Sequence, residues 1–175
     1  MKKLLVVVDF QVDFVNGALG FAGAEALDER ICFLIKSFED DGNDVVFTLD
    51  THHEDYMNTE EGKYLPVPHC IEGTPGYDFY GNVKNMAKGH KIFAKPTFPS
   101  LELGDWLKDK DYEEVTVCGL DLSICVLSNA VIAKAALPNA HIVVDASCSS
   151  GGDEHANAVA IEQLKRIQVE IKHNK

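Results

Sequence analysis

The sequence has no apolar run that is long enough to cross a membrane. A membrane-spanning helix needs about 20 mostly apolar residues, whereas the first apolar run, at 4–8, ends at Asp9. No small-residue cleavage site follows this run, so the N-terminus does not have the pattern of a secretory signal peptide. We therefore expect a cytoplasmic protein that does not associate with membranes and whose first apolar run is a buried strand.

The chain also lacks an excess of basic residues and any closely paired cysteines. It has 16 Lys and Arg against 28 Asp and Glu, and the resulting net charge of −12 argues against nucleic-acid binding, which needs clustered cations. The five cysteines, none of them in a C-x-x-C pair, indicate free thiols in a reducing compartment. The length of 175 residues fits a single domain spanning 1–175.

Apolar, β-branched runs alternate with segments whose apolar residues recur with helical spacing. Strands are predicted at 4–10, 44–50, 90–96, 113–120, 141–146 and 168–172, and helices at 24–39, 82–88, 101–110, 123–137 and 153–166. This alternation predicts an α/β fold: a three-layer, doubly wound, mostly parallel six-stranded sheet with helices on both faces. The segment 51–80 has no clear period and is too long for an ordinary connection, which indicates a functional loop.

Functional side chains are expected at the carboxyl ends of the strands, where ligands bind in open α/β sheets. The residues at these ends are Asp9, Asp50, Lys95, the turn 119–125 and Asp145. Because parallel strands end at the same edge of a sheet, several of these side chains are expected to converge on one site.

Cys125 follows the strand predicted at 113–120 and lies near the start of the next helix. A helix N-terminus lowers the pKa of a thiol, and its free N–H groups can hold an oxyanion. Cys125 is therefore a candidate nucleophile, with Asp9 to accept its proton and Lys95 to hold both anions in place. From position alone, Cys125 could equally be a small buried apolar residue, Asp9 a capping residue and Lys95 a surface residue.

Carboxylates and imidazoles gather at 50–69. Asp50 and His52 form a D-x-H pair on one side of an extended segment, because side chains alternate along a strand. His69 follows two prolines that stiffen its approach. A carboxylate with two imidazoles suits Zn, Fe or Mn. The alternative is a polar surface loop that contains histidines by chance.

Four segments, in this order, resemble motifs of the isochorismatase-like cysteine hydrolases and, within that family, of the nicotinamidases. They are VVVDFQVDF (6–14), LDTHHEDY with LPVPHCIEGTPGYDF (within 49–79), AKPTFPS (94–100) and VCGLDLSICV (117–126). The resemblance implies the catalytic residues Asp9, Lys95 and Cys125 and the metal ligands Asp50, His52 and His69.

The chain departs from the family pattern at two places. Many nicotinamidases have a second loop histidine where Asn58 stands, so Glu61, with Glu60 as the next candidate, is predicted to complete the metal site. The nucleophile turn has Leu122 and Ser123 in place of the usual Thr-Asp pair.

The resemblance also implies the surroundings of the nucleophile. A cis peptide bond in the family maps to Asp121–Leu122, and the amides of Leu122 and Cys125 would form the oxyanion hole. Phe14 maps to an aromatic residue that packs on the substrate ring, and Leu65 stands where the family often has an aromatic residue. Phe14 and Leu65 are therefore predicted to line the substrate pocket.

The expected reaction is hydrolysis of nicotinamide to nicotinate and ammonia through a thioester on Cys125, assisted by one divalent transition metal (Zn, Fe or Mn) per chain. One alternative is hydrolysis of an N-carbamoyl or ureido compound, for which the family generally lacks the metal loop. A second alternative is a non-catalytic binding protein on the same fold, which the unusual LDLS turn suggests. The resemblance implies a homo-oligomer, either a dimer or a tetramer, with a small-molecule amide as its substrate.

Overall fold

The computed structural model describes residues 2–173 and contains a six-stranded sheet. Its strands are β1 (Lys2–Val8), β2 (Asp44–Asp50), β3 (Lys91–Lys95), β4 (Tyr112–Gly119), β5 (His141–Ser149) and β6 (Glu170–Lys172). All neighbouring strands are parallel, in the order β3-β2-β1-β4-β5-β6. The predicted α/β class is confirmed, and the sheet is parallel throughout rather than mostly parallel.

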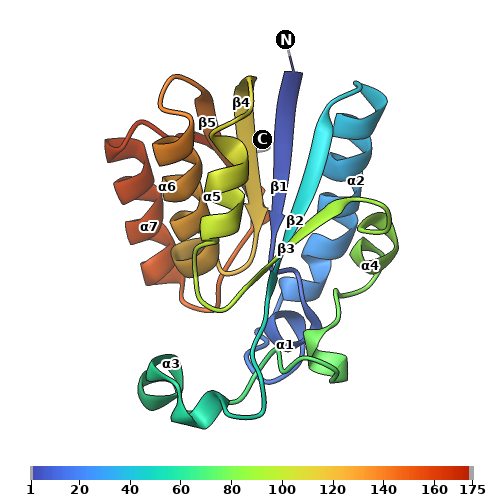
Figure 1. The fold of residues 1–175 in the computed structure, drawn as a ribbon, viewed down its shortest axis with the longest axis vertical. Helices are drawn as coiled ribbons and strands as arrows, with labels where there is room; N and C mark the ends of the chain where they lie inside the picture. The colour runs from blue at the N-terminus through green and yellow to red at the C-terminus, as the bar shows by residue number, and fades with distance from the viewer. Residues whose placement is uncertain (1, 174–175) are drawn as a thin grey trace.

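Helices cover both faces of this sheet. The α-helices are α1 (Val12–Val15), α2 (Leu27–Asp40), α3 (Glu60–Tyr64), α4 (Val83–Met86), α5 (Leu101–Leu107), α6 (Leu127–Ala136) and α7 (Glu154–Arg166). Shorter turns are the 3-10 helices η1 (Ala24–Ala26), η2 (Tyr56–Asn58) and η3 (Pro75–Tyr77) and the π-helical η4 (Leu122–Val126). Figure 1 shows α5, α6 and α7 on one side of the sheet and α2 and α4 on the other. The predicted three-layer arrangement is therefore confirmed.

The first strand is apolar without interruption because both of its faces are buried. Leu4 and Val6 belong to the core that packs against α5, α6 and α7, whereas Leu5 and Val7 belong to the core beneath α2 and α4. All four side chains are 0% exposed, and complete burial of a Leu or Val contributes about 1.5–3 kcal/mol. Burial on both faces distinguishes a central parallel strand from the alternating pattern of a half-exposed one.

Side-chain caps fix where several helices begin. Ser100 accepts a hydrogen bond from the Leu103 N–H at 3.0 Å at the start of α5, and Asp153 accepts one from the Ala156 N–H at 2.9 Å at the start of α7. A cap of this kind satisfies an N–H group that has no partner within the helix and stabilises it by about 1 kcal/mol. The caps therefore define where α5 and α7 begin.

Two predicted elements differ from the structure. β5 continues to Ser149, which pairs with Gly119 on β4, so Asp145 lies within the strand and not at its carboxyl end. The prediction that Asp145 lies at the carboxyl end of its strand was therefore wrong. The segment 51–80, predicted without regular structure, contains η2, α3 and η3, which are too short to produce a periodic pattern.

The carboxyl ends of the central strands meet at the lower edge of the sheet in Figure 1, beside α1 and the segment that carries α3. Gly119 permits a close approach between β4 and β1 at this edge, because a Cβ atom there would lie 2.1 Å from the Val8 carbonyl oxygen. The β2–β3 register places Asp50 opposite Lys95. Three strand ends are thus brought within side-chain reach of one another.

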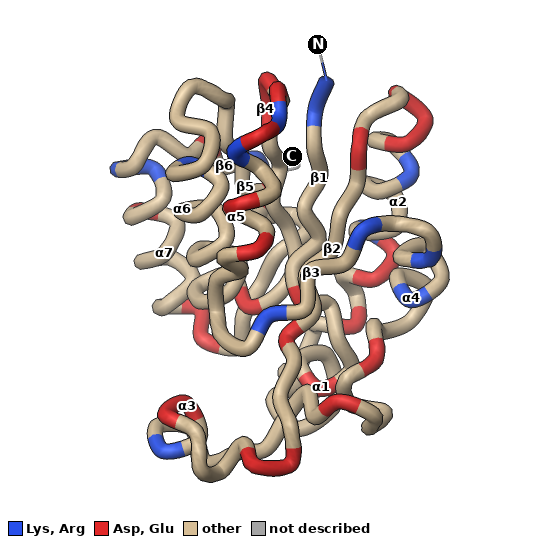
Figure 2. The backbone as a smooth tube through the Cα atoms, in the orientation of Figure 1, with Lys and Arg blue, Asp and Glu red and all other residues tan. Residues whose placement is uncertain are grey.

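Charged residues of both signs are spread over the fold. Figure 2 shows acidic positions around α1 and along the segment that carries α3, and further acidic and basic positions elsewhere. Among the described helices, none is long and apolar enough to cross a membrane.

Candidate active site

Asp9, Lys95 and Cys125 form one buried cluster at the carboxyl ends of β1, β3 and β4. The Lys95 Nζ lies 2.5 Å from Asp9 Oδ2 and 3.8 Å from Cys125 Sγ. Their exposed fractions are 0% for Asp9, 1% for Lys95 and 5% for Cys125. The structure therefore brings the three predicted catalytic residues together and excludes the alternative of a surface lysine, while their catalytic roles remain predictions.

Asp9 is placed to act as a base within this cluster. Its Oδ1 accepts a hydrogen bond from the Thr48 hydroxyl at 2.6 Å, which leaves Oδ2 toward Lys95. Burial raises the pKa of Asp9, and the Lys95 charge only partly opposes this effect. A carboxylate with a raised pKa holds a proton more readily, which suits a group that must accept a proton and later return it.

Cys125 does not have the lowered pKa that its sequence position suggested. It lies in η4, which continues directly into α6. Burial, and then the negative charge of Asp9, raise the pKa of Cys125 well above its ordinary value, while Lys95 opposes them. The predicted position near a helix start is confirmed, but because burial and Asp9 raise its pKa, this thiol needs a neighbouring base to become a nucleophile.

Lys95 connects the cluster to the adjacent loop. Burial alone would lower its pKa, but Asp9, Cys125 and Asp50 together raise it, so the ammonium group stays charged. Besides Asp9, its Nζ meets Asp50 Oδ1 at 3.3 Å and donates to the Thr97 carbonyl at 3.0 Å. Lys95 is thus a fixed cation between Cys125 and a second group of polar side chains.

That second group consists of two carboxylates and two imidazoles. One oxygen or nitrogen atom from each of Asp50, His52, Glu61 and His69 lies within 4.8 Å of the other three. Asp50 Oδ2 is 3.0 Å from His52 Nε2 and 3.4 Å from His69 Nε2. Glu61 Oε1 is 3.6 Å from His52 Nε2 and 3.5 Å from His69 Nε2. The predicted ligand set converges, although its metal-binding role remains a prediction.

The two candidates for the fourth ligand differ in position. Glu61 turns inward beside the imidazoles, and its Oε2 is buried without a hydrogen-bond partner among the described residues. Glu60 is exposed and pairs with Lys63 at 3.0 Å on the outside of α3. The geometry therefore favours Glu61, and its orphaned oxygen is a feature that a bound cation would satisfy.

Hydrogen bonding orients the donor atoms of this group. The His69 Nδ1 lies 2.8 Å from the Val67 carbonyl, which can only accept, so Nδ1 carries a proton and Nε2 is the ring nitrogen that faces Asp50 and Glu61. Burial would raise the pKa of Asp50, but hydrogen bonds from His52 and His69 and the Lys95 charge outweigh it and lower that pKa. The carboxylate of Asp50 is therefore ionised. Two carboxylates and two imidazoles suit a divalent transition metal.

Tyr56 is a member of this site that the sequence did not identify. Its side chain is 1% exposed and packs edge-on against both imidazoles, with ring centroids 4.8 Å from His52 and 5.1 Å from His69. Its hydroxyl donates to the Leu65 carbonyl at 2.8 Å. Tyr56 thus joins the two histidines to the far end of α3, a contact that no local sequence pattern indicates.

The backbone at the nucleophile turn differs from the prediction. The cis peptide bond lies at Leu120–Asp121, one residue before the predicted position. The Leu122 N–H donates to the Ser150 carbonyl at 2.8 Å, so it is not free to hold an oxyanion, and its assignment to the oxyanion hole was wrong. Among the described residues, the Asp121 N–H has no acceptor.

Phe14 and Leu65, the predicted pocket residues, line a cavity of about 480 Å³ beside this turn. The other lining residues are Ala18, Leu19, Gly20, Phe21, Leu120, Asp121, Ile124, Gly152 and Asp153. The Phe14 ring centroid is 5.5 Å from that of His69, so the cavity lies next to the histidine group. A largely apolar cavity with a few polar groups at its edge is typical of a small-molecule site.

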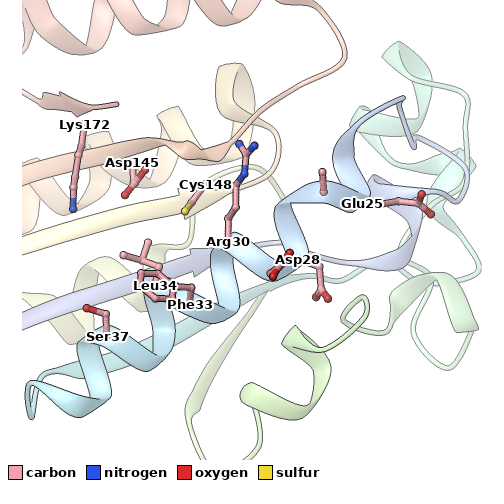
Figure 3. A pocket seen from close by; sticks show the side chains of 11 residues that line it. Glu25, Asp28, Arg30, Phe33, Leu34, Ser37, Asp145, Cys148 and Lys172 are labelled. Atoms are coloured by element: carbon pink, nitrogen blue, oxygen red, sulfur yellow. The ribbon is translucent and has the colours of Figure 1, made fainter. Parts of the chain in front are cut away.

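A larger cavity, of about 640 Å³, lies elsewhere. Figure 3 shows Arg30, Leu34 and Ser37 from α2 on one side and Asp145, Cys148 and Lys172 from β5 and β6 on the other. Neither this cavity nor the 480 Å³ cavity is lined by the predicted catalytic residues or metal ligands, but only the smaller one contains the predicted pocket residues Phe14 and Leu65.

The sequence and the fold of this chain have counterparts in known proteins. The family described as the isochorismatase domain matches residues 3–171. The isochorismatase family protein PncA of Bacillus subtilis (strain 168) is 33% identical over 144 residues, which cover 75% of this chain and 78% of that protein. The nicotinamidase/pyrazinamidase of Mycobacterium tuberculosis (strain ATCC 25618 / H37Rv) is 28% identical over 184 residues, 97% of each chain. The crystal structure of the pyrazinamidase of Pyrococcus horikoshii in complex with zinc has a TM-score of 0.86 at 24% identity, covering 99% of this chain and 100% of that chain.

Proposed function

Because the chain belongs to the isochorismatase family and is a hydrolase of that family, we propose that it cleaves the C–N bond of a small-molecule amide, converting nicotinamide to nicotinate and ammonia. The observation that carries this proposal is that Lys95 contacts both the catalytic cluster and the carboxylate–imidazole group. Lys95 contacts Asp9 and Cys125 on one side and Asp50 of the carboxylate–imidazole group on the other. The similarity to a nicotinamidase/pyrazinamidase over 97% of the chain supports the substrate class.

The reaction begins with proton transfer from the Cys125 thiol to Asp9. The thiolate attacks the amide carbonyl, a C–S bond forms, and the negative charge on the carbonyl oxygen is held by the Asp121 and Cys125 N–H groups. Lys95 remains charged throughout and stabilises whichever of its two neighbours is anionic. Its fixed position requires no reorganisation as the charge moves from Asp9 to sulfur.

Collapse of the tetrahedral intermediate breaks the C–N bond. Asp9 returns its proton to the leaving nitrogen, and ammonia departs, leaving a thioester on Cys125. Asp9 then takes a proton from water as the water attacks the thioester, and gives that proton to the departing sulfur. The acid product is released and both residues return to their starting protonation states.

Asp50, His52, Glu61 and His69 would hold one divalent transition metal per chain, with zinc, iron and manganese all suited to the donor set. When bound, such an ion supplies a Lewis-acid position for the ring nitrogen of the substrate or for a water molecule. The zinc complex of the Pyrococcus horikoshii pyrazinamidase supports this assignment. Phe14 stands between the histidine group and the 480 Å³ cavity, where it would pack against a flat heteroaromatic ring.

One observation favours a second substrate class. Asp121 lines the cavity beside the nucleophile turn, and its Oδ1 accepts hydrogen bonds from the Ser123 N–H and hydroxyl, each at 2.8 Å. A carboxylate at this wall would suit the additional N–H donors of a ureido or N-carbamoyl compound. These compounds therefore remain the alternative substrates.

The test is release of ammonia from nicotinamide, measured beside ureido and N-carbamoyl compounds and simple amides, before and after chelation. We expect nicotinamide to be the best substrate and chelation to abolish its hydrolysis. Cys125→Ala provides the control for background hydrolysis. If the wild type released no ammonia from any of these compounds while binding them, the non-catalytic alternative would hold instead.

Two further properties remain predictions. The family resemblance leads us to expect a dimer or tetramer, which sedimentation or light scattering would measure. The expectations of a cytoplasmic location and of no nucleic-acid partner rest on the sequence.

A further inference from the structure

We propose that Gln11 and Asp13 are positioning residues that set metal affinity, by fixing the backbone next to the ligands Asp50 and His69. The inference rests on the metal site of the proposed function. It starts from two polar side chains in the segment after β1 whose contacts the mechanism above does not use. Neither side chain touches the reacting atoms, and both bind backbone groups of the metal-site segments.

Strand β2 extends beyond the end of its neighbour β1. β1 and β2 pair from Leu4↔Asp44 to Val8↔Thr48, and β1 then ends. Asp9 has a φ of 45°, in the left-handed region, and the chain turns away after it. On the other side, β3 continues to pair, because the Thr51 N–H donates to the Lys95 carbonyl at 2.9 Å. The Asp50 peptide groups that face β1 therefore have no strand to bind.

The Gln11 side chain takes the place of that missing strand. Its Oε1 accepts from the Asp50 N–H at 2.8 Å, and its Nε2 donates to the Asp50 carbonyl at 2.9 Å. The same Nε2 also donates its second hydrogen to the Tyr77 carbonyl, at 2.9 Å. A primary amide carries one acceptor and two donors in a plane, so it can replace a peptide group. Gln11 is 0% exposed, and both of its donors are used.

Gln11 is itself firmly held. Its N–H donates to the Asp9 carbonyl at 2.8 Å, and it forms an antiparallel bridge with Phe79. The clamp on Asp50 therefore ties the metal-ligand carboxylate to the same turn that carries catalytic Asp9. Because Asp50 presents Oδ2 to both imidazoles and Oδ1 to Lys95, rotation of its backbone would disturb two groups at once.

Asp13 acts in the same way on the other side of the loop. Its Oδ2 accepts from the N–H of Cys70, the residue after His69, at 2.8 Å. The Cys70 carbonyl in turn accepts from the His52 N–H at 3.0 Å. The carboxylate fits closely against Gly76, where a Cβ atom would lie 2.2 Å from Oδ2. One short segment thus supports the backbone beside three of the four ligands.

The test is the affinity for Zn²⁺, measured by competition with a chelator of known affinity. Gln11→Met keeps the volume but removes all three hydrogen bonds, and we expect its Kd for Zn²⁺ to rise about 10- to 100-fold, as for other groups that orient metal ligands. Asp13→Asn should weaken binding less, because one oxygen can still accept a hydrogen bond. The matched control is Gln163→Met, an exposed glutamine on α7, which should leave the Kd unchanged.

A second readout separates positioning from general destabilisation. The visible spectrum of the Co²⁺-loaded protein reports ligand geometry, and its bands should shift in Gln11→Met but not in Gln163→Met. If wild-type protein bound no stoichiometric Zn²⁺, the metal site of the proposed function would be wrong. If wild type bound Zn²⁺ and folded Gln11→Met bound it equally well with an unchanged Co²⁺ spectrum, the positioning role would be wrong. Should Gln11→Met fail to fold, wild-type affinity in both Gln11→Asn and Asp13→Asn would overturn it.

Discussion

The catalytic cluster and the carboxylate–imidazole group lie side by side, but they are built in different ways. Asp9 and Lys95 extend directly from β1 and β3, and Cys125 follows β4, so the register of the sheet places all three. Of the four candidate ligands, only Asp50 belongs to a strand. His52, Glu61 and His69 come from the 51–80 segment, where Asp13 binds the backbone after His69 and Tyr56 packs against both imidazoles.

This difference separates two ways of holding functional groups. A cluster at the carboxyl ends of parallel strands is held in place by the register of the sheet. A loop-borne cluster needs its own hydrogen bonds, and the ion it binds would supply part of its order. We therefore expect the two groups to respond independently to substitution, except through the contact between Lys95 and Asp50.

The largest expected effect is loss of the nucleophile. Cys125→Ala should lower kcat for amide hydrolysis by about 10⁴-fold or more, because the variant lacks the sulfur that forms the thioester. Zn²⁺ affinity should not change, since Cys125 is not among the candidate ligands. Cys32→Ala, a partly buried thiol on α2, is the control. Retention of amidase activity in Cys125→Ala would eliminate the thioester mechanism.

The next effect separates the two roles of Asp9. Asp9→Asn should lower kcat by about 10²- to 10⁴-fold, because the leaving nitrogen loses its proton donor. Yet burial and then the Asp9 charge raise the pKa of Cys125, while Lys95 lowers it. Removing the Asp9 charge should therefore lower the thiol pKa.

Iodoacetamide labelling of Cys125 as a function of pH measures this change. Its midpoint should move to lower pH in Asp9→Asn, so the variant should label faster at neutral pH while turning over more slowly. A midpoint that moved to higher pH would show that Asp9 does not control the thiol.

The third effect belongs to the loop. Glu61→Gln should raise the Kd for Zn²⁺ by about 10- to 100-fold or more, since groups that only support metal ligands already contribute that much. Glu60→Gln should leave the Kd unchanged. Glu60 is the matched control because it is the adjacent residue on α3 and its carboxylate faces solvent. Equal losses in the two variants would show that the charge of α3, rather than a ligand, determines affinity.

Sequence patterns predict the scaffold and the catalytic cluster well because both depend on burial along strands. The apolar run before Asp9 and the run before Asp50 indicate buried strands ending in carboxylates, and the common edge of a parallel sheet brings their ends together. The position of Lys95 follows from the same rule. Family motifs then identify which of these residues carry chemistry.

Tertiary contacts explain where the predictions from sequence differ from the structure. Burial and then Asp9 raise the pKa of Cys125, although the residue lies near a helix start. Asp145 was misplaced because Ser149 pairs with β4 even though its segment lacks the apolar character of a strand. Gln11 lies within the motif at 6–14, but its role depends on where β1 ends relative to β2. No local pattern specifies that offset.

The smallest effect tests whether the two regions are energetically separate. Ser100 and Thr59 both cap helices, at 3.0 Å in each case, but Ser100 caps α5 on the scaffold and Thr59 caps α3 in the loop. Ser100→Ala should lower the free energy of unfolding by about 1 kcal/mol and leave Zn²⁺ affinity unchanged. Thr59→Ala should change the metal-free unfolding energy by less than about 0.5 kcal/mol and yet weaken Zn²⁺ binding, because α3 carries Glu61. Urea unfolding in the presence of chelator, with Zn²⁺ titration of the same samples, measures both quantities. An equal loss of metal-free stability in the two variants would mean that the loop and the sheet unfold together as one cooperative unit.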